Sequence, residues 1–174
     1  LINFFRNLNC KIYKAERIDT HGGSLRVYLS NNENIKIENS LNLLLKEEEH
    51  FGIKRFSTYQ IFGKKIESLK DKVLKNISIL KEKNKKIIAY GSPAKATTAL
   101  NYFNISKEID FIIEDNKLKH GKYLPGINIP IVGKDKILGK ASCILVLAWN
   151  FFNEIKKKNK TISDNFLSIK DLER

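Results

Sequence analysis

Three short runs of apolar residues, without polar alternation inside them, constrain the fold of this chain more than any other feature. They occupy residues 86–90, 109–113 and 143–148, and helix-forming segments separate them. Continuous apolar strands are typical of parallel sheets that helices cover on both faces. The sequence therefore predicts a Rossmann-like α/β domain with a parallel sheet flanked by helices. Its other expected elements are strands at 129–132 and 165–169 and helices at 94–101 and 153–160.

The earlier part of the chain predicts an antiparallel strand pair followed by helices. Residues 10–18 and 24–29 alternate polar and apolar side chains around a glycine pair, as the two strands of a hairpin do. A short helix is expected at 41–51. A long amphipathic helix is expected at 61–83, because apolar residues recur there at three- and four-residue steps. These residues are Ile66, Leu69, Val73, Ile77 and Leu80.

The amphipathic helix has two interpretations: a coiled coil or partner-binding helix, and a helix that packs on the following sheet. We predict the second, because a sheet domain follows it directly in the chain. The expected organisation has three parts. The end of a helix and the strand pair are expected in 1–36, a helical connection in 37–84, and the Rossmann-like domain in 85–174.

The start of the chain indicates a piece of a longer protein. The sequence contains no methionine and begins at Leu1, and apolar residues at positions 1, 4, 5 and 8 show helical spacing with no N-cap before them. Two strands alone are marginally stable in water. We therefore expect the strand pair to belong to a larger sheet whose other strands lie upstream.

Composition narrows the classes of partner. The formal net charge is +13, but the excess is lysine that is scattered or in runs without aromatic residues, and arginine, which suits bidentate nucleic-acid recognition, is scarce. We expect a solvated lysine surface and no nucleic-acid partner. No run approaches the apolar length of a membrane span, so we expect no membrane contact and a cytoplasmic setting. Cys10 and Cys143 are far apart and no CxxC occurs, which indicates neither a disulfide framework nor a metal site.

The first candidate site follows the strand at 86–90. Gly91 allows a tight turn, and Pro93 can begin a helix whose free N–H groups attract an anion. Ser92 and Lys95 add a hydroxyl and an ammonium group, and Tyr90 ends the strand. Only one glycine is present, so the turn is neither a dinucleotide fingerprint nor a P-loop. The alternatives are a phosphate-binding turn and an ordinary strand-to-helix turn with a surface lysine.

The second candidate site ends the strand at 109–113. Glu114, Asp115 and Asn116 stand where a dinucleotide fold holds a ribose. The glycine fingerprint of such folds is absent, so NAD binding is not favoured. The other interpretation is a polar loop that caps a helix.

The third candidate site is the turn of the predicted hairpin. Gly22 and Gly23 let a backbone approach a ligand closely, while Ser24 and Arg26 can bind phosphate or sugar oxygens. His21 is the one candidate here for proton transfer. The alternative is a tight loop with an exposed histidine.

Together these motifs resemble the S-adenosylmethionine-dependent sugar C-methyltransferases of deoxysugar and surface-glycan biosynthesis. In that family the corresponding stretches read roughly HGGSLR, YGAPAKGNTLLNY, D-N-P-x-K-x-G-x-x-x-P-G and LAWNF, in this order. Here they lie at 21–26, 90–102, 115–125 and 147–151. The departures are Ser92 for alanine, Ala96 for glycine, and Lys117 where the family often has proline.

The resemblance implies a role in sugar C-methylation. It also explains why the sequence begins within a helical pattern that has no N-cap. Such enzymes carry an N-terminal zinc-binding module, a central methyltransferase domain and a C-terminal Rossmann-like domain. The zinc ligands, the S-adenosylmethionine loop and the catalytic cluster would lie upstream, so we expect no catalytic and no metal-binding residue here, His21 being the single catalytic candidate. The strand pair would be the tail of the methyltransferase sheet.

By the same resemblance, a nucleotide-diphosphate sugar and the methyltransferase domain are the expected partners of this region. The residues expected to hold the nucleotide-diphosphate-linked keto-deoxysugar are His21, Gly22, Gly23, Ser24, Arg26, Tyr90, Gly91, Ser92, Lys95 and Asn116. Two other functions remain open. One is a stand-alone Rossmann-like domain that senses a nucleotide or NAD, and the other is a structural scaffold.

Overall fold

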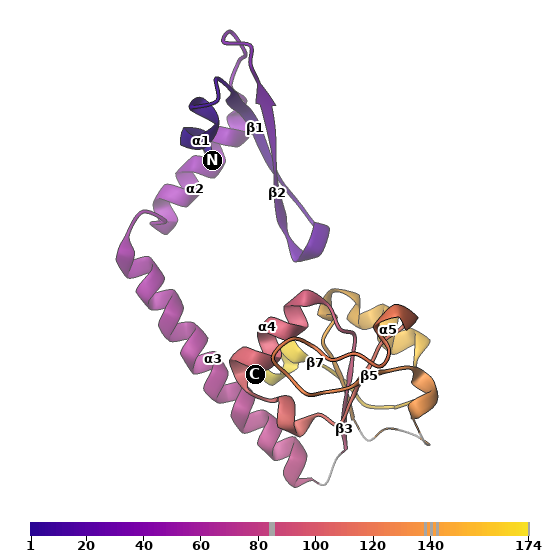
Figure 1. Cartoon of the computed structure of the whole chain (residues 1–174). Coiled ribbons are helices and arrows are strands. Elements are labelled where there is room, and N and C mark those ends of the chain that lie inside the picture. The colour runs from indigo at the N-terminus through magenta and orange to yellow at the C-terminus, as the bar shows by residue number, and fades with distance from the viewer. Residues whose placement is uncertain (84–85, 138, 140, 142, 174) are drawn as a thin grey trace. The chain divides into compact units, whose positions relative to one another are not determined.

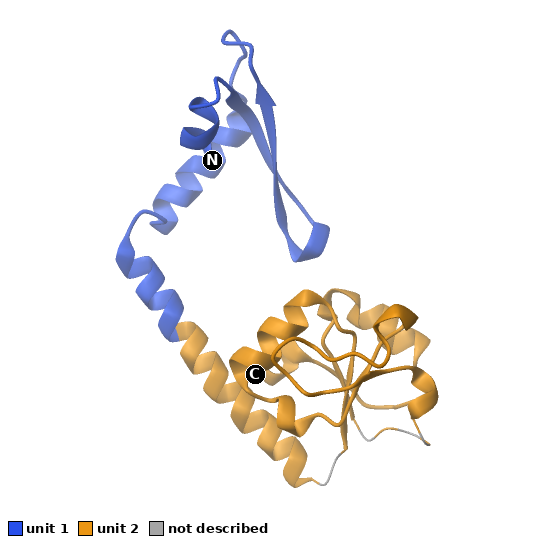
Figure 2. Cartoon of the chain, viewed as in Figure 1, with its two compact units in different colours: residues 1–64 blue, residues 65–174 orange. Residues whose placement is uncertain are grey.

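A computed structural model describes residues 1–83, 86–137, 139, 141 and 143–173 of the chain. The chain divides into two units, Leu1–Lys64 and Lys65–Arg174, which are described separately (Figure 2). The three-part organisation expected from the sequence stays a prediction, and its boundary at 84–85 lies outside the described residues.

The second unit contains the predicted parallel sheet (Figure 1). All its neighbouring strands pair in parallel, in the order β5-β4-β3-β6-β7. The strands are β3 Ile87–Tyr90, β4 Ile112–Ile113, β5 Ile131–Val132, β6 Cys143–Val146 and β7 Phe166–Ser168, and the helices are the later part of α3 Phe56–Glu82, α4 Ala94–Phe103 and α5 Phe152–Lys158. The fold is the Rossmann-like α/β class that the apolar runs predict.

Helices cover both faces of this sheet, which explains why its strands are apolar throughout. Ile87 and Ala89 of β3 pack in one core with residues of α3 and α4, whereas Ile88 and Tyr90 lie in a second core with residues of α5. Figure 1 shows these helices on opposite sides of the sheet. Because successive strand residues point to opposite faces, both sets must be apolar.

Two strands have no more than half of their expected length. The run 109–113 forms β4 only at its end, although the Asp110 N–H donates to the Ile87 carbonyl (3.1 Å) and the Phe111 carbonyl accepts from Ala89 (3.0 Å). β5 begins after Pro130, which has no N–H to donate to a ladder. The segment before it instead forms a single antiparallel bridge between Tyr123 and Pro130.

The long helix α3 begins at Phe56, five residues before the predicted start, and packs as expected against the sheet. Its Val73 and Ile77 are buried in the core that contains Ile87 of β3. This contact confirms the packing interpretation of the amphipathic pattern.

The first unit contains the predicted antiparallel pair, β1 Lys11–Ile18 and β2 Ser24–Ser30. Helices α1 Ile2–Arg6 and α2 Asn39–Phe51 accompany it, and the small core includes Ile12, Ala15 and Leu41. α2 ends where Gly52 adopts a left-handed conformation (φ 79°) and donates its N–H back to the last turn.

In the part of the chain that the structure describes, no helix combines the length and the apolar content that a membrane crossing requires.

Ile77→Ala should destabilise the second unit by about 2–5 kcal/mol, because it leaves a cavity between α3 and the sheet. The side chain of Ile77 is 2% exposed, whereas Ile79 on the same helix is 38% exposed and provides the matched control. Ile79→Ala should change the free energy of unfolding by about 0.5 kcal/mol or less. The chain has one tryptophan, Trp149, so urea unfolding followed by its fluorescence reports on this unit. Equal losses in both variants would contradict the packing described for α3.

Candidate functional site

The candidate site lies at the carboxyl edge of the parallel sheet, between the ends of β3 and β6. The strand order reverses there, since the chain runs from β3 outward to β5 and returns to β6 on the other side. Open α/β sheets bind ligands at this point, beyond the carboxyl ends of their strands. A cavity of about 320 Å³ opens there, which we call the strand-end crevice. Its lining includes Tyr90, Ser92, Glu114, Asp115, Phe151, Glu154 and Lys158.

Gly91 lets the ends of β3 and β6 approach each other closely. It has a φ of +87°, and a Cβ built at this position would lie 2.8 Å from the Cβ of Ala148. Its N–H donates to the carbonyl of Ile113 at 2.8 Å, which fixes the turn to β4. Only glycine meets both the conformational and the steric requirement without strain.

The Glu114 carboxylate caps the turn after β3. One of its oxygens accepts the backbone N–H of Ser92 at 3.0 Å and also the hydroxyl of Ser92. Its other oxygen accepts the N–H of Asn116 at 3.1 Å. The Ser92 residue is 5% exposed and the Glu114 side chain 14% exposed. The predicted phosphate-binding turn thus already carries an internal carboxylate on one of its N–H groups.

The loop after β4 is held against the same turn. The Lys119 ammonium donates to the Ser92 carbonyl at 3.0 Å and lies 3.4 Å from the Glu114 carboxylate. The Asn116 side chain accepts the N–H of Leu118 at 3.0 Å and caps the short helix η3 Lys117–Lys119. His120 Nε2 lies 2.8 Å from the Glu114 carbonyl oxygen. The loop is therefore anchored at several points.

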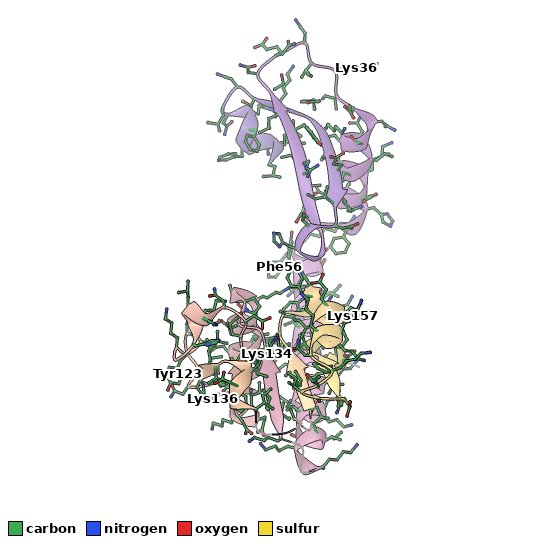
Figure 3. The ribbon with its side chains drawn as sticks, turned by 90° about the vertical axis from the view of Figure 1, so that its right-hand side faces the viewer. Lys36, Phe56, Tyr123, Lys134, Lys136 and Lys157 are labelled. Atoms are coloured by element: carbon green, nitrogen blue, oxygen red, sulfur yellow. The ribbon has the colours of Figure 1, made fainter. Side chains whose placement is uncertain are left out.

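Asp115 links the end of β3 to the short helix η4 Lys134–Lys136. The Tyr90 hydroxyl lies 2.9 Å from each Asp115 carboxylate oxygen, and the Lys134 ammonium (labelled in Figure 3) lies 2.9 Å from one of them. Lys134 also stands over the Tyr90 ring, 5.5 Å from its centroid. These three side chains form one polar cluster.

The surroundings of Glu114 and Asp115 favour the ionised form of both carboxyl groups. Burial raises the pKa of Glu114, but the Ser92 hydroxyl, two backbone N–H groups and the Lys119 charge outweigh it, so the pKa lies below its usual value. Burial likewise opposes ionisation of Asp115, yet Lys134 and Tyr90 lower its pKa. Burial is the main cause that raises the pKa of the Tyr90 hydroxyl. Tyr90 therefore acts here as a hydrogen-bond donor and not as a base.

Lys95 is turned toward the end of β6. Its ammonium group lies 4.0 Å from the centroid of the Trp149 ring, a cation–π contact. Burial and the nearby charge of Lys170 lower its pKa. The first N–H groups of α4, at Ala94 and Lys95, have no acceptor within the helix by its geometry. These groups and the Lys95 charge are the part of the predicted turn that stays open to an anion.

A second hollow shares Ser92 and Lys119 with the strand-end crevice. This cavity of about 420 Å³, which we call the α4 groove, runs between the start of α4 and the loop that precedes β5. It is lined by Ser92, Ala94, Thr97, Thr98, Lys119, Lys122, Tyr123, Leu124, Pro125 and Ile131.

The third candidate site, in the first unit, is an exposed hairpin turn. His21, Gly22 and Gly23 all have positive φ (56°, 89° and 117°), which explains the glycine pair. The Ser24 hydroxyl donates to the Thr20 carbonyl at 3.0 Å. Arg26 lies 3.5 Å from the Glu16 carboxylate on the neighbouring strand.

The structure thus assembles Tyr90, Gly91, Ser92 and Asn116 at one edge, together with groups that the sequence did not single out. Lys119 is the lysine of the D-N-x-x-K-x-G run, so the motif contained a signal for it. Lys134 is one of many lysines and carried no signal. Among the residues that the structure describes, no group of three or more histidine, cysteine or acidic side chains could hold a metal ion.

The fold and this edge define a Rossmann-like α/β domain with a charged crevice where its strand order reverses. The family model described as the C-methyltransferase C-terminal domain matches residues 19–166. The chain therefore belongs to the family of C-methyltransferase C-terminal domains.

One curated relative is the C-methyltransferase NovU of Streptomyces niveus, which is 27% identical over 168 residues. The match covers 95% of this chain and 40% of the relative. The chain thus spans about two-fifths of the length of that relative.

Gly91→Ala should destabilise the second unit by more than about 2 kcal/mol, because a left-handed alanine is strained and its Cβ meets Ala148. Gly121 is the matched control: its φ is also positive (+74°), but a Cβ there meets nothing within 4 Å. Gly121→Ala should lower the free energy of unfolding by only about 1–2 kcal/mol, which is the cost of placing an alanine in a left-handed conformation. Urea unfolding followed by Trp149 fluorescence compares them, and equal losses would show that the close approach at Gly91 is unimportant.

Proposed function

We propose that this chain is the substrate-side region of an S-adenosylmethionine-dependent C-methyltransferase that acts on a nucleotide-diphosphate-linked keto-deoxysugar. The whole enzyme would remove a proton next to the keto group and methylate the resulting carbanion. The region described here would bind and position the sugar nucleotide. The family assignment and the charged edge of the sheet support this proposal.

The open N–H groups at the start of α4 carry the proposal most directly. A helix N-terminus is partially positive, and its free N–H groups point toward a bound anion. Lys95 and Lys119 add positive charge on either side of this turn. A diphosphate carries the charge and the oxygen acceptors that these groups match.

Positioning is a sufficient catalytic role for such a region. The diphosphate and the nucleoside do not react, but contacts to remote parts of a substrate can be used to orient the reacting centre. We propose that the hairpin turn in the first unit contributes further contacts through His21, Gly22, Gly23, Ser24 and Arg26. His21 would bind the ligand in this account and would not transfer a proton.

The cofactor is proposed to bind in another part of the whole protein. The turn after β3 does not fit an S-adenosylmethionine loop, because its one glycine already contacts Ala148 and its Ser92 N–H is taken by Glu114. An upstream zinc module belongs to the same proposal, as the resemblance of the motifs to sugar C-methyltransferases implies. A cytoplasmic setting, without a nucleic-acid or membrane partner, completes it.

Calorimetric titration of the chain with a uridine diphosphate sugar tests the proposed function. Lys95→Ala should weaken the affinity about tenfold or more, because a charge-assisted contact contributes about 1.5–3 kcal/mol. Lys107→Ala is the matched control: Lys107 is exposed and lies beyond the C-terminal end of α4, in η2 Ser106–Glu108, so its loss should have no effect. S-adenosylmethionine should not bind this chain.

Three results would contradict the proposal. If Lys95→Ala leaves the affinity for the sugar nucleotide unchanged, the alternative function as a structural scaffold is favoured. Tight binding of NAD in place of the sugar nucleotide would favour the dinucleotide-sensing domain. Micromolar binding of S-adenosylmethionine would overturn the division of roles within the enzyme.

A further inference from the structure

Two hollows share Ser92 and Lys119 in their linings but differ in their other charged groups. The strand-end crevice is lined by the carboxylates of Glu114, Asp115 and Glu154 and also by the lysines Lys119 and Lys158. The α4 groove has no carboxylate in its lining, and beside the shared Lys119 it contains Lys122. A phosphate that approaches the turn after β3 can in principle enter either hollow, so the charges decide between them.

Glu114 occupies the anion position on the crevice side. Its carboxylate accepts both the N–H and the hydroxyl of Ser92, and its second oxygen accepts the N–H of Asn116. A phosphate could reach the Ser92 N–H only by displacing this carboxylate. Two anions at one site repel each other strongly where solvent screening is reduced, and the Glu114 side chain is only 14% exposed.

The α4 groove offers a more positive environment, because no carboxylate lines it. The hydroxyl-bearing residues Thr97 and Thr98 line it, and it adjoins the N-terminus of α4. Lys122 is exposed and has no ion-pair partner among the described residues. Tyr123, labelled at the edge of the second unit in Figure 3, is 60% exposed and also lines the groove.

We infer that Glu114 is a specificity-determining residue that closes the strand-end crevice to phosphate and directs the diphosphate of the ligand into the α4 groove, beside Lys122. This inference rests on the proposed function for the identity of the ligand. The internal carboxylate takes the place of a ligand phosphate on the Ser92 N–H. The crevice then remains for uncharged, hydroxyl-bearing parts of the ligand, because its carboxylates are hydrogen-bond acceptors.

Titration of the chain with inorganic pyrophosphate, followed by backbone amide chemical shifts, tests the inference. In the unaltered chain the amides of Ala94 and Lys95 should shift, whereas the amide of Ser92 should not. Lys122→Ala should weaken pyrophosphate binding about tenfold. Lys158→Ala is the matched control, since Lys158 is an exposed lysine of the crevice and its loss should leave the affinity unchanged.

Two substitutions of Glu114 open the crevice in different ways. Glu114→Ala empties the anion position, and Glu114→Gln keeps its size but removes its charge. In both variants pyrophosphate should shift the Ser92 amide and should bind about tenfold more tightly. If Glu114→Ala loses the native fluorescence of Trp149, this variant does not fold, and the test then rests on Glu114→Gln.

Three results would overturn the inference: a shift of the Ser92 amide in the unaltered chain, its absence from the folded Glu114 variants, or equal effects of Lys122→Ala and Lys158→Ala. Failure of the proposed function gives a different result. In that case the Ser92 amide shifts in the Glu114 variants, while the uridine diphosphate sugar does not bind the unaltered chain.

Discussion

The hydrogen bonds that the Glu114 carboxylate accepts from Ser92 and Asn116 organise the carboxyl edge of the sheet. They join the end of β4 to the turn after β3 and anchor the loop that leads to β5. The cost of partly burying this carboxylate is offset because several donors satisfy it, which keeps its pKa below the usual value. This contact also fixes which donors of the turn stay open to a ligand, because the Ser92 N–H is already taken by Glu114.

The apolar sheet and its charged edge have different physical roles. Burial on both faces holds β3 and β6 in fixed register, and Gly91 allows their ends to meet. This rigid framework positions polar groups such as Ser92 and Glu114, which are 5% and 14% exposed, where solvent screening is reduced. Charged contacts are stronger there than on an open surface. A site that binds the non-reacting part of a substrate benefits from such rigidity, because it loses less entropy when the ligand is oriented.

Much of the fold followed from the sequence, because the apolar runs admit few other structures. The strands at 86–90 and 143–148, the helix that Pro93 introduces and the hairpin around Gly22 were all predicted close to their observed bounds. The role of Glu114 was not predicted. It depends on the pairing of β3 with β4, which brings together two residues 22 positions apart in the chain. The contact of Lys95 with Trp149 likewise depends on β6 lying beside β3, which a one-dimensional pattern does not specify.

A crystal structure of the chain with a bound nucleotide-diphosphate sugar tests the central claim most directly. The account predicts the diphosphate at the start of α4 and in the groove beside Lys122, with the Glu114 carboxylate still on the Ser92 N–H. A diphosphate on the Ser92 N–H with Glu114 displaced, or a ligand bound away from this edge of the sheet, would contradict it.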